Sequence, residues 1–271
     1  GFAAKNHFRA TTADAARLSG RAGVPVVGSV VLNLAVGGIS AQAVRGALSG
    51  CKRDSAAADI HPGRFIVWMP TIHAEAHLAH NKRFDILVEW GGVPRYQTRF
   101  PDGTGLTVFG GRGDGGGREL SRAALEVLDI VAAEDLVLAT GHLSADEVET
   151  LVPAAVDRGA GRIILTHPLY QVTALSAAGQ RDRGRLPGVY TELSFVNLEI
   201  DDLPMEAYVE VIRLVGPEKV VLSSDLGQVN RRIVADGWRD YHAGLSGLGI
   251  GDDEFLAMAA ENPHKLVFGE P

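Results

Sequence analysis

Cysteine is almost absent from this sequence of 271 residues, which contains Cys51 and no other cysteine. One cysteine cannot form a disulfide within the chain, and a chain without paired cysteines is typical of a reducing compartment. The sequence therefore predicts a cytoplasmic location.

Long apolar runs and an excess of positive charge are also missing. No run reaches the roughly 18 consecutive apolar residues that a membrane-spanning helix needs. The formal net charge is -7, and no basic stripe offsets it, which argues against nucleic-acid binding. We expect a small-molecule substrate as partner, and neither a membrane nor a nucleic acid.

The sequence does have the composition of an ordinary globular protein, with 46% hydrophobic and 22% charged residues. Its length suits one large α/β barrel or two smaller domains. Short apolar runs alternate with helical stretches, which implies a parallel sheet with right-handed crossovers. About seven strands are expected, in the stretches Gly1–Asn6, Pro25–Asn33, Arg64–Pro70, Leu136–Ala139, Arg162–Pro168, Gly188–Phe195 and Lys219–Gln228.

Three of these strands lead into a residue that commonly binds metal ions. His142 follows the apolar run LVLA, and His167 and Asp225 occupy the corresponding places after two later strands. Ser144 and Glu147, just after His142, have the spacing of a capping box that opens a helix. Residues after the carboxyl ends of barrel strands face one mouth, so the three predicted ligands should converge.

Two imidazoles and one carboxylate suit a zinc ion that keeps an open position for water. Such an ion lowers the pKa of its water toward neutrality, and a carboxylate beside that water acts as a general base. The sequence therefore predicts a divalent-metal site at His142, His167 and Asp225, with zinc first and manganese, iron or nickel as alternatives. Asp225 and His142 are the predicted catalytic residues. A single histidine in a loop is more often a capping or surface residue. The prediction of a metal site therefore depends on finding a ligand-type residue after three different strands.

Lys5 and His7 are two residues apart on a predicted strand and therefore lie on one face of it. If that face is the barrel interior, the buried lysine needs a partner or a modification. Lys5 is then either carboxylated to a carbamate that bridges two metal ions, or salt-bridged to a carboxylate of the site. His7 is a further candidate metal ligand.

Three other residues are predicted to contact the substrate. His73 follows one strand, Asn33 ends another, and Glu192 lies within the strand VYTELSF. His77 and His80 continue the helical spacing from His73, and we expect them at the surface or hydrogen-bonded to the segment that follows.

Residues 82–119 interrupt the alternation of strands and helices. Turn-forming residues at Asp102–Gly105 and the glycine run at 110–117 are typical of an inserted hairpin. The glycine run lacks the strand-to-helix context of a nucleotide-binding loop. We expect a single barrel domain over residues 1–271, in which this insertion after the fourth strand forms a lid or a contact in a homo-oligomer. Its aromatic residues Trp90, Tyr96 and Phe100 serve either role, or form a small core of the insertion itself.

Together these residues resemble the amidohydrolase superfamily of metal-dependent barrels. The resemblance rests on TGH at His142, THP at His167, SSD at Asp225 and the terminal ENPHKLVFG, and it spans nearly the whole chain. Within the superfamily the sequence is similar to a group of uncharacterised bacterial proteins, through KNHF, VLN with VGG, WMPT and ATGHLS.

This resemblance implies a distorted (β/α)₈ barrel in which His142, His167 and Asp225 are the ligands of the fifth, sixth and eighth strands. Asp225 is also the implied base. The first strand of the superfamily carries a His-x-His pair, which this sequence lacks, and the strand of Lys5 corresponds to the second. Many members carry a carboxylated lysine on the fourth strand, where this chain has FIVWMP. We therefore expect a further strand–helix unit of roughly 30–40 residues before Gly1.

Three functions remain open at this point. The first is hydrolysis of an amide, lactam, ester or lactone bond of a small molecule by a metal-bound hydroxide. The second is a non-hydrolytic reaction on the same barrel, such as a metal-dependent decarboxylation or another lyase step. The third is a degenerate, non-catalytic barrel that binds a small ligand or serves as a structural subunit, because the ligands of the first strand are missing.

Overall fold

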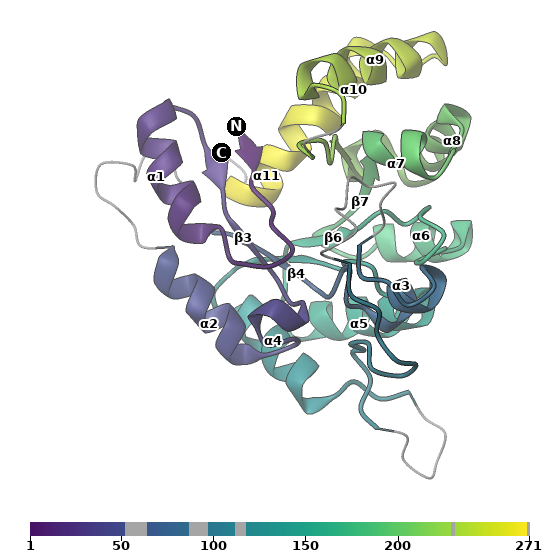
Figure 1. Ribbon diagram of the computed structural model, residues 1–271. Helices are drawn as coiled ribbons and strands as arrows, with labels where there is room; N and C mark the ends of the chain where they lie inside the picture. The colour runs from purple at the N-terminus through teal and green to yellow at the C-terminus, as the bar shows by residue number, and fades with distance from the viewer. Residues whose placement is uncertain (52–63, 87–96, 112–117, 229–230, 270–271) are drawn as a thin grey trace.

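The computed structural model describes residues 1–51, 64–86, 97–111, 118–228 and 231–269 (Figure 1). Its main sheet has six strands, and each pairs in parallel with the next along the chain. These strands are β3 (Ser29–Val31), β4 (Ile66–Trp68), β5 (Val137–Ala139), β6 (Ile163–Leu165), β7 (Val189–Ser194) and β8 (Val220–Ser223).

Two short strands form a separate two-stranded sheet next to the start of this one. β1 (Phe2–Ala3) pairs in parallel with β2 (Val26–Val27), and Gly28 alone separates β2 from β3. The strands therefore follow the order of the chain without a reversal, which is the order of a barrel, whereas a doubly wound sheet reverses at a switch point. With β2 and β3 taken as one interrupted strand, the strands agree with those expected from the sequence.

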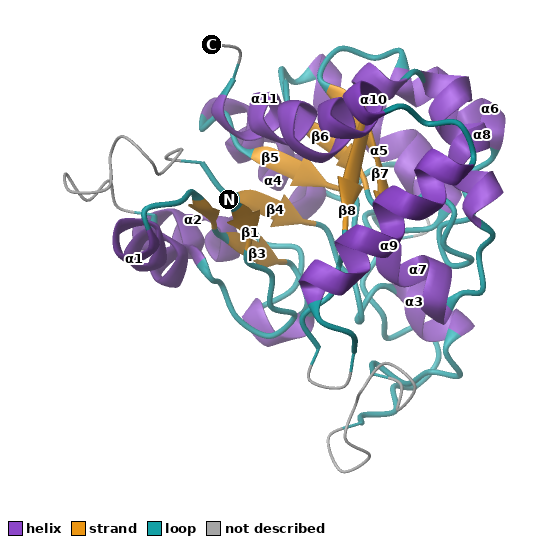
Figure 2. Ribbon diagram, turned by 90° about the horizontal axis from the view of Figure 1, so that it is seen from above, coloured by secondary structure: helices purple, strands orange, loops and turns teal. Residues whose placement is uncertain are grey.

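Side chains join the first strand to the last. Lys5, just after β1, forms an ion pair with Asp225, just after β8, with 3.2 Å between Nζ and Oδ1. Among the described residues no backbone pairing joins β1 to β8. The fold is a mixed α/β fold with a parallel sheet, arranged as a distorted barrel (Figure 2).

Helices follow the strands and cover the outside of the sheet (Figure 1). A π-helical turn, Ala257–Glu261, joins the last two of them, and 3-10 turns lie at Leu34–Val36 and Pro217–Lys219. The α-helices are α1 (Thr12–Ala22), α2 (Ala41–Gly50), α3 (Glu75–His80), α4 (Arg122–Ala133), α5 (Ala145–Asp157), α6 (Ala177–Gly184), α7 (Phe195–Ile200), α8 (Met205–Val215), α9 (Val234–Gly247), α10 (Asp252–Leu256) and α11 (Asn262–Phe268).

The core has an outer and an inner layer because successive residues of a strand point to opposite faces. Val67 and Leu138 pack in a cluster with residues of α2, α4 and α5. Their neighbours Trp68 and Ala139 belong to a second cluster, which contains Leu266 of α11. The last helix therefore fills one end of the barrel and leaves the other end for the residues that follow the strands.

The predicted capping box is confirmed at the start of α5. The Ser144 side chain accepts from the Glu147 backbone N–H, and the Glu147 carboxylate accepts from the Ser144 backbone N–H. The same carboxylate also accepts from the Thr107 hydroxyl at 2.6 Å and from the Val108 N–H at 3.1 Å. It thus ties the described part of the insertion to the helix that follows His142.

Between β6 and β7 the Ser176 hydroxyl accepts from the Gly179 N–H and begins the helix α6. The insertion contributes antiparallel bridges between Phe84 and Arg99 and between Phe109 and Leu120. Residues 112–117 of its predicted glycine turn lie outside the described residues, as do Trp90 and Tyr96, so the role of the insertion as lid or oligomer contact stays a prediction.

The helices of the described ranges are too short or too polar to cross a membrane.

Candidate active site

Four polar side chains form a continuous line across the mouth of the barrel. Lys5 contacts Asp225 after β8, whose Oδ2 lies 3.6 Å from Nε2 of His167 after β6. The other ring nitrogen of His167, Nδ1, lies 3.2 Å from Oε2 of Glu192 in β7. His167 and Glu192 are buried, whereas the Asp225 side chain remains 29% exposed. The strand ends thus bring together residues that are far apart in sequence.

The charges along this line alternate. Burial alone would lower the pKa of His167, but the carboxylates of Glu192 and Asp225 outweigh burial and raise it. Burial acts to raise the pKa of Asp225, yet the Lys5 ammonium and His167 hold that pKa well below its usual value. Asp225 is therefore a carboxylate, and His167 holds its proton more firmly than a free imidazole does. That proton must leave before His167 binds a metal ion, since only a deprotonated nitrogen is a ligand.

His142 lies beside this line, in a stack of buried imidazoles. Its ring centroid is 6.0 Å from that of His167 and 5.0 Å from that of His77 in α3. Nδ1 of His142 lies 2.9 Å from Nδ1 of His77, and His77 Nε2 lies 3.2 Å from the Asp85 carbonyl oxygen. Burial lowers the pKa of His77 to about 3 and the pKa of His142 well below its usual value. Both rings are therefore neutral at pH 7.

A tight backbone turn places His142. Gly141 has a φ of 62°, and a Cβ atom there would lie 2.4 Å from the Met69 carbonyl oxygen and 2.5 Å from that of Pro70. The His142 N–H donates to the Pro70 oxygen at 2.9 Å. The end of β5 is therefore held directly against the end of β4, an approach that only glycine permits.

Asn33 organises the other side of the mouth. Its Oδ1 accepts from the backbone N–H groups of Thr71 (3.0 Å) and His73 (3.2 Å). Its Nδ2 donates to the His7 carbonyl oxygen (3.1 Å) and to the Thr71 hydroxyl (2.9 Å). The same hydroxyl lies 2.9 Å from His7 Nδ1. Asn33 thus fixes three segments of the chain relative to one another. Because its side chain is fully buried in this network, its predicted contact with a substrate stays a prediction.

His73 faces the insertion. Its Nε2 lies 3.8 Å from Oδ2 of Asp85, and its ring packs edge-on against Phe100, with 5.2 Å between centroids. Burial lowers its pKa, and the Asp85 carboxylate only partly offsets this. Two of the predicted substrate residues therefore lie in different parts of the mouth. Glu192 lies on the line with His167, whereas His73 lies against the insertion.

Several buried polar atoms here form no hydrogen bond with the described residues. They are both ring nitrogens of His167, Oε2 of Glu192 and Nδ1 of His73. Unsatisfied buried groups are uncommon in native proteins and call for a partner such as a ligand or ion. By donor type the predicted ligands His142, His167 and Asp225 fit a divalent metal, since two imidazoles and a carboxylate are ligands of catalytic zinc. Nevertheless, no three His, Cys, Asp or Glu residues of the described ranges are already arranged as a metal-binding group.

One of the two alternatives expected for His77 is confirmed, because its Nε2 is hydrogen-bonded to the carbonyl oxygen of Asp85 in the insertion. The sequence did not predict that His77 is fully buried and contacts His142. The spacing of His73, His77 and His80 defines a helix face but does not say which part of that face is covered. The available signal was the apolar Leu78 beside His77, because it marks the part of the helix that is buried. His80, at the end of α3, is exposed.

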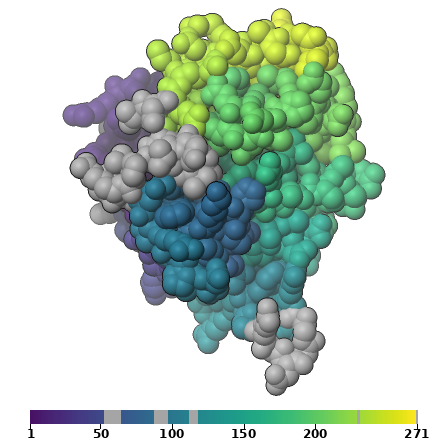
Figure 3. Space-filling model, turned by 45° about the vertical axis from the view of Figure 1, so that its right-hand side comes forward, coloured from purple at the N-terminus to yellow at the C-terminus, as the bar shows by residue number. Residues whose placement is uncertain are grey.

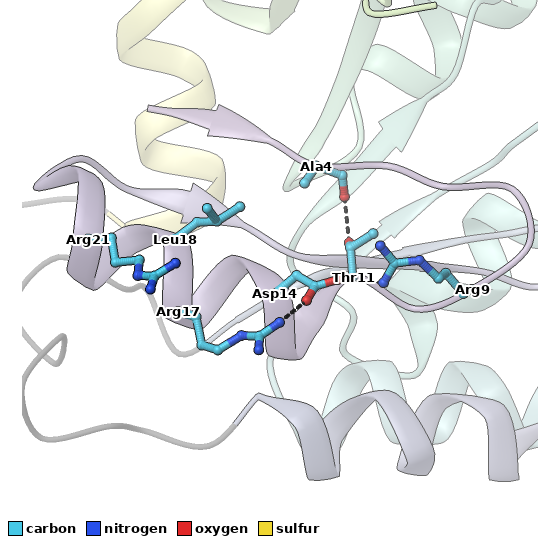
Figure 4. A pocket seen from close by; sticks show the side chains of 7 residues that line it. All are labelled: Ala4, Arg9, Thr11, Asp14, Arg17, Leu18 and Arg21. Atoms are coloured by element: carbon cyan, nitrogen blue, oxygen red, sulfur yellow. Dashed lines mark hydrogen bonds and ion pairs between the residues drawn. The ribbon is translucent and has the colours of Figure 1, made fainter.

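The hollow drawn in Figure 4 is separate from this line of residues. It has a volume of about 420 Å³ and lies along α1. The Asp14 carboxylate at its wall pairs with both Arg9 and Arg17, which partly neutralises its basic lining. The described part of the insertion lies at the molecular surface, in blue in Figure 3.

A comparison with protein families gives one match. The model described as "Family of unknown function (DUF6282)" matches residues 1–192. No curated protein matches the chain.

Solved structures give only distant likenesses. An amidohydrolase from Burkholderia multivorans has 15% identity and a TM-score of 0.44, over 56% of this chain and 59% of that one. N-acetyl-D-glucosamine-6-phosphate deacetylase from Mycobacterium smegmatis has 18% identity and a TM-score of 0.46, over 89% of this chain and 65% of that one. An amidohydrolase from Pseudomonas aeruginosa has 11% identity and a TM-score of 0.49, over 93% and 82%. The chain thus spans less than two thirds of the first two structures, and likenesses at this level carry no argument about its reaction.

Proposed function

The chain belongs to the family of unknown function DUF6282. Because membership of this family indicates no reaction, we propose a reaction from the residues of the site. The proposed reaction is hydrolysis of an amide, lactam, ester or lactone bond in a small molecule. The observation that carries the proposal is the line Lys5–Asp225–His167–Glu192, with His142 beside it, at the ends of five different strands.

We propose that His142, His167 and Asp225 hold a divalent metal ion, zinc first. When bound, such an ion lowers the pKa of a water molecule and polarises the carbonyl group of a substrate. The approach of Asp225 Oδ2 to His167 Nε2 at 3.6 Å, with the His142 ring beside them, supports this role. Lys5, which pairs with Oδ1 of Asp225, then acts either as a counter-charge or, when carboxylated, as a carbamate ligand. His7 is a further candidate ligand.

The chain's own residues supply the proton transfer. Asp225 is held as a carboxylate by Lys5 and His167. It would accept a proton from the attacking water as general base and return it to the leaving nitrogen or oxygen when the substrate bond breaks. Glu192 orients the His167 ring from the opposite side. Asn33 holds His7 and Thr71 in place and so shapes the pocket for the substrate.

The test uses the purified full chain and a panel of amides, lactams, esters and lactones. Metal content is measured first, and activity is then compared without metal and with added Zn²⁺, Mn²⁺, Fe²⁺ or Ni²⁺. We expect metal-dependent turnover that is lost in His142→Ala and His167→Ala. His264→Ala, at an exposed histidine of α11, is the matched control and should keep full activity. Full activity in His167→Ala contradicts the site assignment. Reaction in H₂¹⁸O must place solvent oxygen in a product, and its absence indicates the lyase alternative.

A second candidate is a small-ligand-binding barrel without catalysis. The observation that favours it is the ion pair between Lys5 and Asp225, in which the chain's own ammonium contacts the predicted base. In that case less than about a tenth of an equivalent of metal binds after gentle purification, and an anionic small molecule would bind against Lys5. Metal analysis separates this candidate from the first.

A further inference from the structure

His77 bridges a backbone carbonyl and the ring of His142. The Asp85 carbonyl oxygen only accepts hydrogen bonds, so the contact of 3.2 Å requires the proton of His77 to be on Nε2. A neutral imidazole with a proton on Nε2 has a lone pair on Nδ1. Nδ1 of His77 is therefore an acceptor.

The position of the proton on His142 follows in the same way. Its Nδ1 lies 2.9 Å from the acceptor Nδ1 of His77, so the proton between them belongs to His142. A neutral His142 with its proton on Nδ1 has a lone pair on Nε2. No hydrogen bond from the described residues uses that nitrogen, and the ring lies next to His167.

We propose that His77 is a positioning residue, which holds His142 in the Nδ1–H tautomer and keeps the Nε2 lone pair available to a ligand of the site. The partner that selects a tautomer is usually a carboxylate, a carbonyl group or a water molecule. Here the carbonyl group of Asp85 selects the tautomer of His142 through the ring of His77. The tautomer follows from the hydrogen bonds of two neutral rings, and only the use of the lone pair for a metal ion rests on the proposed function.

The geometry also explains why two histidines are buried together. Nearly parallel rings, 24° apart, allow the shared proton to lie along the line between the two nitrogens. A fully buried imidazole without such a partner would leave a polar atom unsatisfied, which destabilises the folded state. His77 and His142 satisfy each other, and Asp85 of the insertion fixes the direction of the bonds.

The experiment measures tautomers directly in the full chain labelled with ¹⁵N at histidine. Two-bond couplings identify which nitrogen of His142 carries the proton, with His142→Gln used to assign its signals. Wild type is compared with His77→Leu, which removes the acceptor, and with His77→Asn, whose side-chain oxygen lies near the position of Nδ1. His80→Leu, at an exposed histidine of the same helix, is the matched control. Co²⁺ titration gives the metal affinity of each protein.

We expect a proton on Nδ1 of His142 in the wild type and a shift toward Nε2 in His77→Leu. Co²⁺ affinity should fall by about 10–100-fold in His77→Leu, recover in part in His77→Asn, and stay unchanged in His80→Leu. A wild-type His142 with a bare Nδ1, or a His77→Leu protein with the wild-type tautomer, overturns the proposal. If the wild type binds no Co²⁺, the metal-based function fails, and the coupling pattern still decides the role of His77.

Discussion

His167 and Asp225 both have left-handed backbone angles, with φ values of 44° and 46°. For residues other than glycine this conformation costs about 1–2 kcal/mol, and such residues gather at functional sites, where the surrounding structure compensates the strain. Here the compensation is visible, because the two side chains contact each other and Asp225 also contacts Lys5. Two of the three predicted ligands thus share a strained backbone conformation, which five other non-glycine residues of the described ranges also adopt.

The first prediction concerns the charge of Asp225. Asparagine adopts left-handed angles readily, so Asp225→Asn should keep the backbone and lose only the carboxylate. We expect kcat to fall by roughly 10²–10⁴-fold, the usual contribution of a general base. The measurement is steady-state kinetics on a substrate found in the panel, with circular dichroism to confirm the fold. A variant with wild-type kcat would show that Asp225 is not the base.

The second prediction concerns the turn before His142. Gly141→Ala places a Cβ atom within 2.4 Å of a backbone oxygen and also strains a positive φ. We expect a loss of about 2–4 kcal/mol in the free energy of unfolding, measured by urea denaturation. Gly159→Ala is the matched control, because Gly159 also has a positive φ but nothing lies within 4 Å of its added Cβ. Equal losses in the two variants would mean that the close approach of β4 and β5 adds nothing to the cost of Gly141→Ala.

At the scale of elements, two arginines fasten α11 to the barrel. Arg162 donates to the carbonyl oxygens of Lys265 and Leu266, each at 2.9 Å. Arg64 donates to that of Val267 at 3.2 Å, and both arginines pair with Asp135. These carbonyls belong to the last turn of the helix, where cations are favourable. The clamp holds the helix whose apolar face closes the inner core.

The third prediction tests this clamp. Arg162→Ala removes two charge-assisted bonds to helix carbonyls, and we expect the free energy of unfolding to fall by about 1–3 kcal/mol. Arg122→Ala removes an exposed pair with Glu126 on α4 and should cost less than about 0.5 kcal/mol. Urea denaturation of both variants makes the comparison. A cost for Arg162→Ala as small as that of the control would mean that apolar packing alone holds α11.

The fourth prediction is the pH dependence of the same clamp. Burial acts to raise the pKa of Asp135, but Arg162 and Arg64 outweigh it and hold that pKa below its usual value. A carboxyl with a lowered pKa in the folded state contributes stability above its unfolded pKa of about 3.9, and this contribution is lost as the pH falls through the folded value.

Asp135→Asn is the matched variant, because Asp135 has a φ of 48° and asparagine tolerates that angle. The stability difference between wild type and variant should be constant above about pH 5 and shrink below about pH 4. Urea midpoints across this range give the measurement. A difference that persists unchanged to pH 2.5 would exclude the carboxylate as its source.

At the scale of the whole molecule, the fifth prediction is that metal binding stabilises the fold. The candidate ligands come from the ends of β5, β6 and β8, so an ion held between them links three separate units of the barrel. At a free concentration near 100 times Kd, Zn²⁺ should add about 2.7 kcal/mol. For a chain of this size, that corresponds to roughly 5–10 °C in Tm.

Differential scanning calorimetry with and without Zn²⁺ measures this shift, and His167→Ala should abolish it. A chelator should return the wild type to its metal-free Tm. An equal rise in Tm for His167→Ala would place the bound zinc elsewhere on the molecule.

The sequence by itself determined the strands and the residues that follow them. Apolar runs of strand length between helical stretches are local features, so β4 to β8 and the places of His142, His167 and Asp225 could be predicted from the order of residues. The capping box at Ser144 was predictable for the same reason, because its hydrogen bonds join residues three positions apart.

Only the tertiary structure decided which of these residues meet. The contact between Lys5 and Asp225 joins the first strand to the last, and no local pattern records the closure of a barrel. The burial of His77 depended on which side of a short helix β5 would cover, and helical spacing is the same for either side. Local periodicity fixes the elements, whereas the proton on His142 and the charge on Asp225 depend on neighbours that the folded chain alone brings within hydrogen-bonding distance.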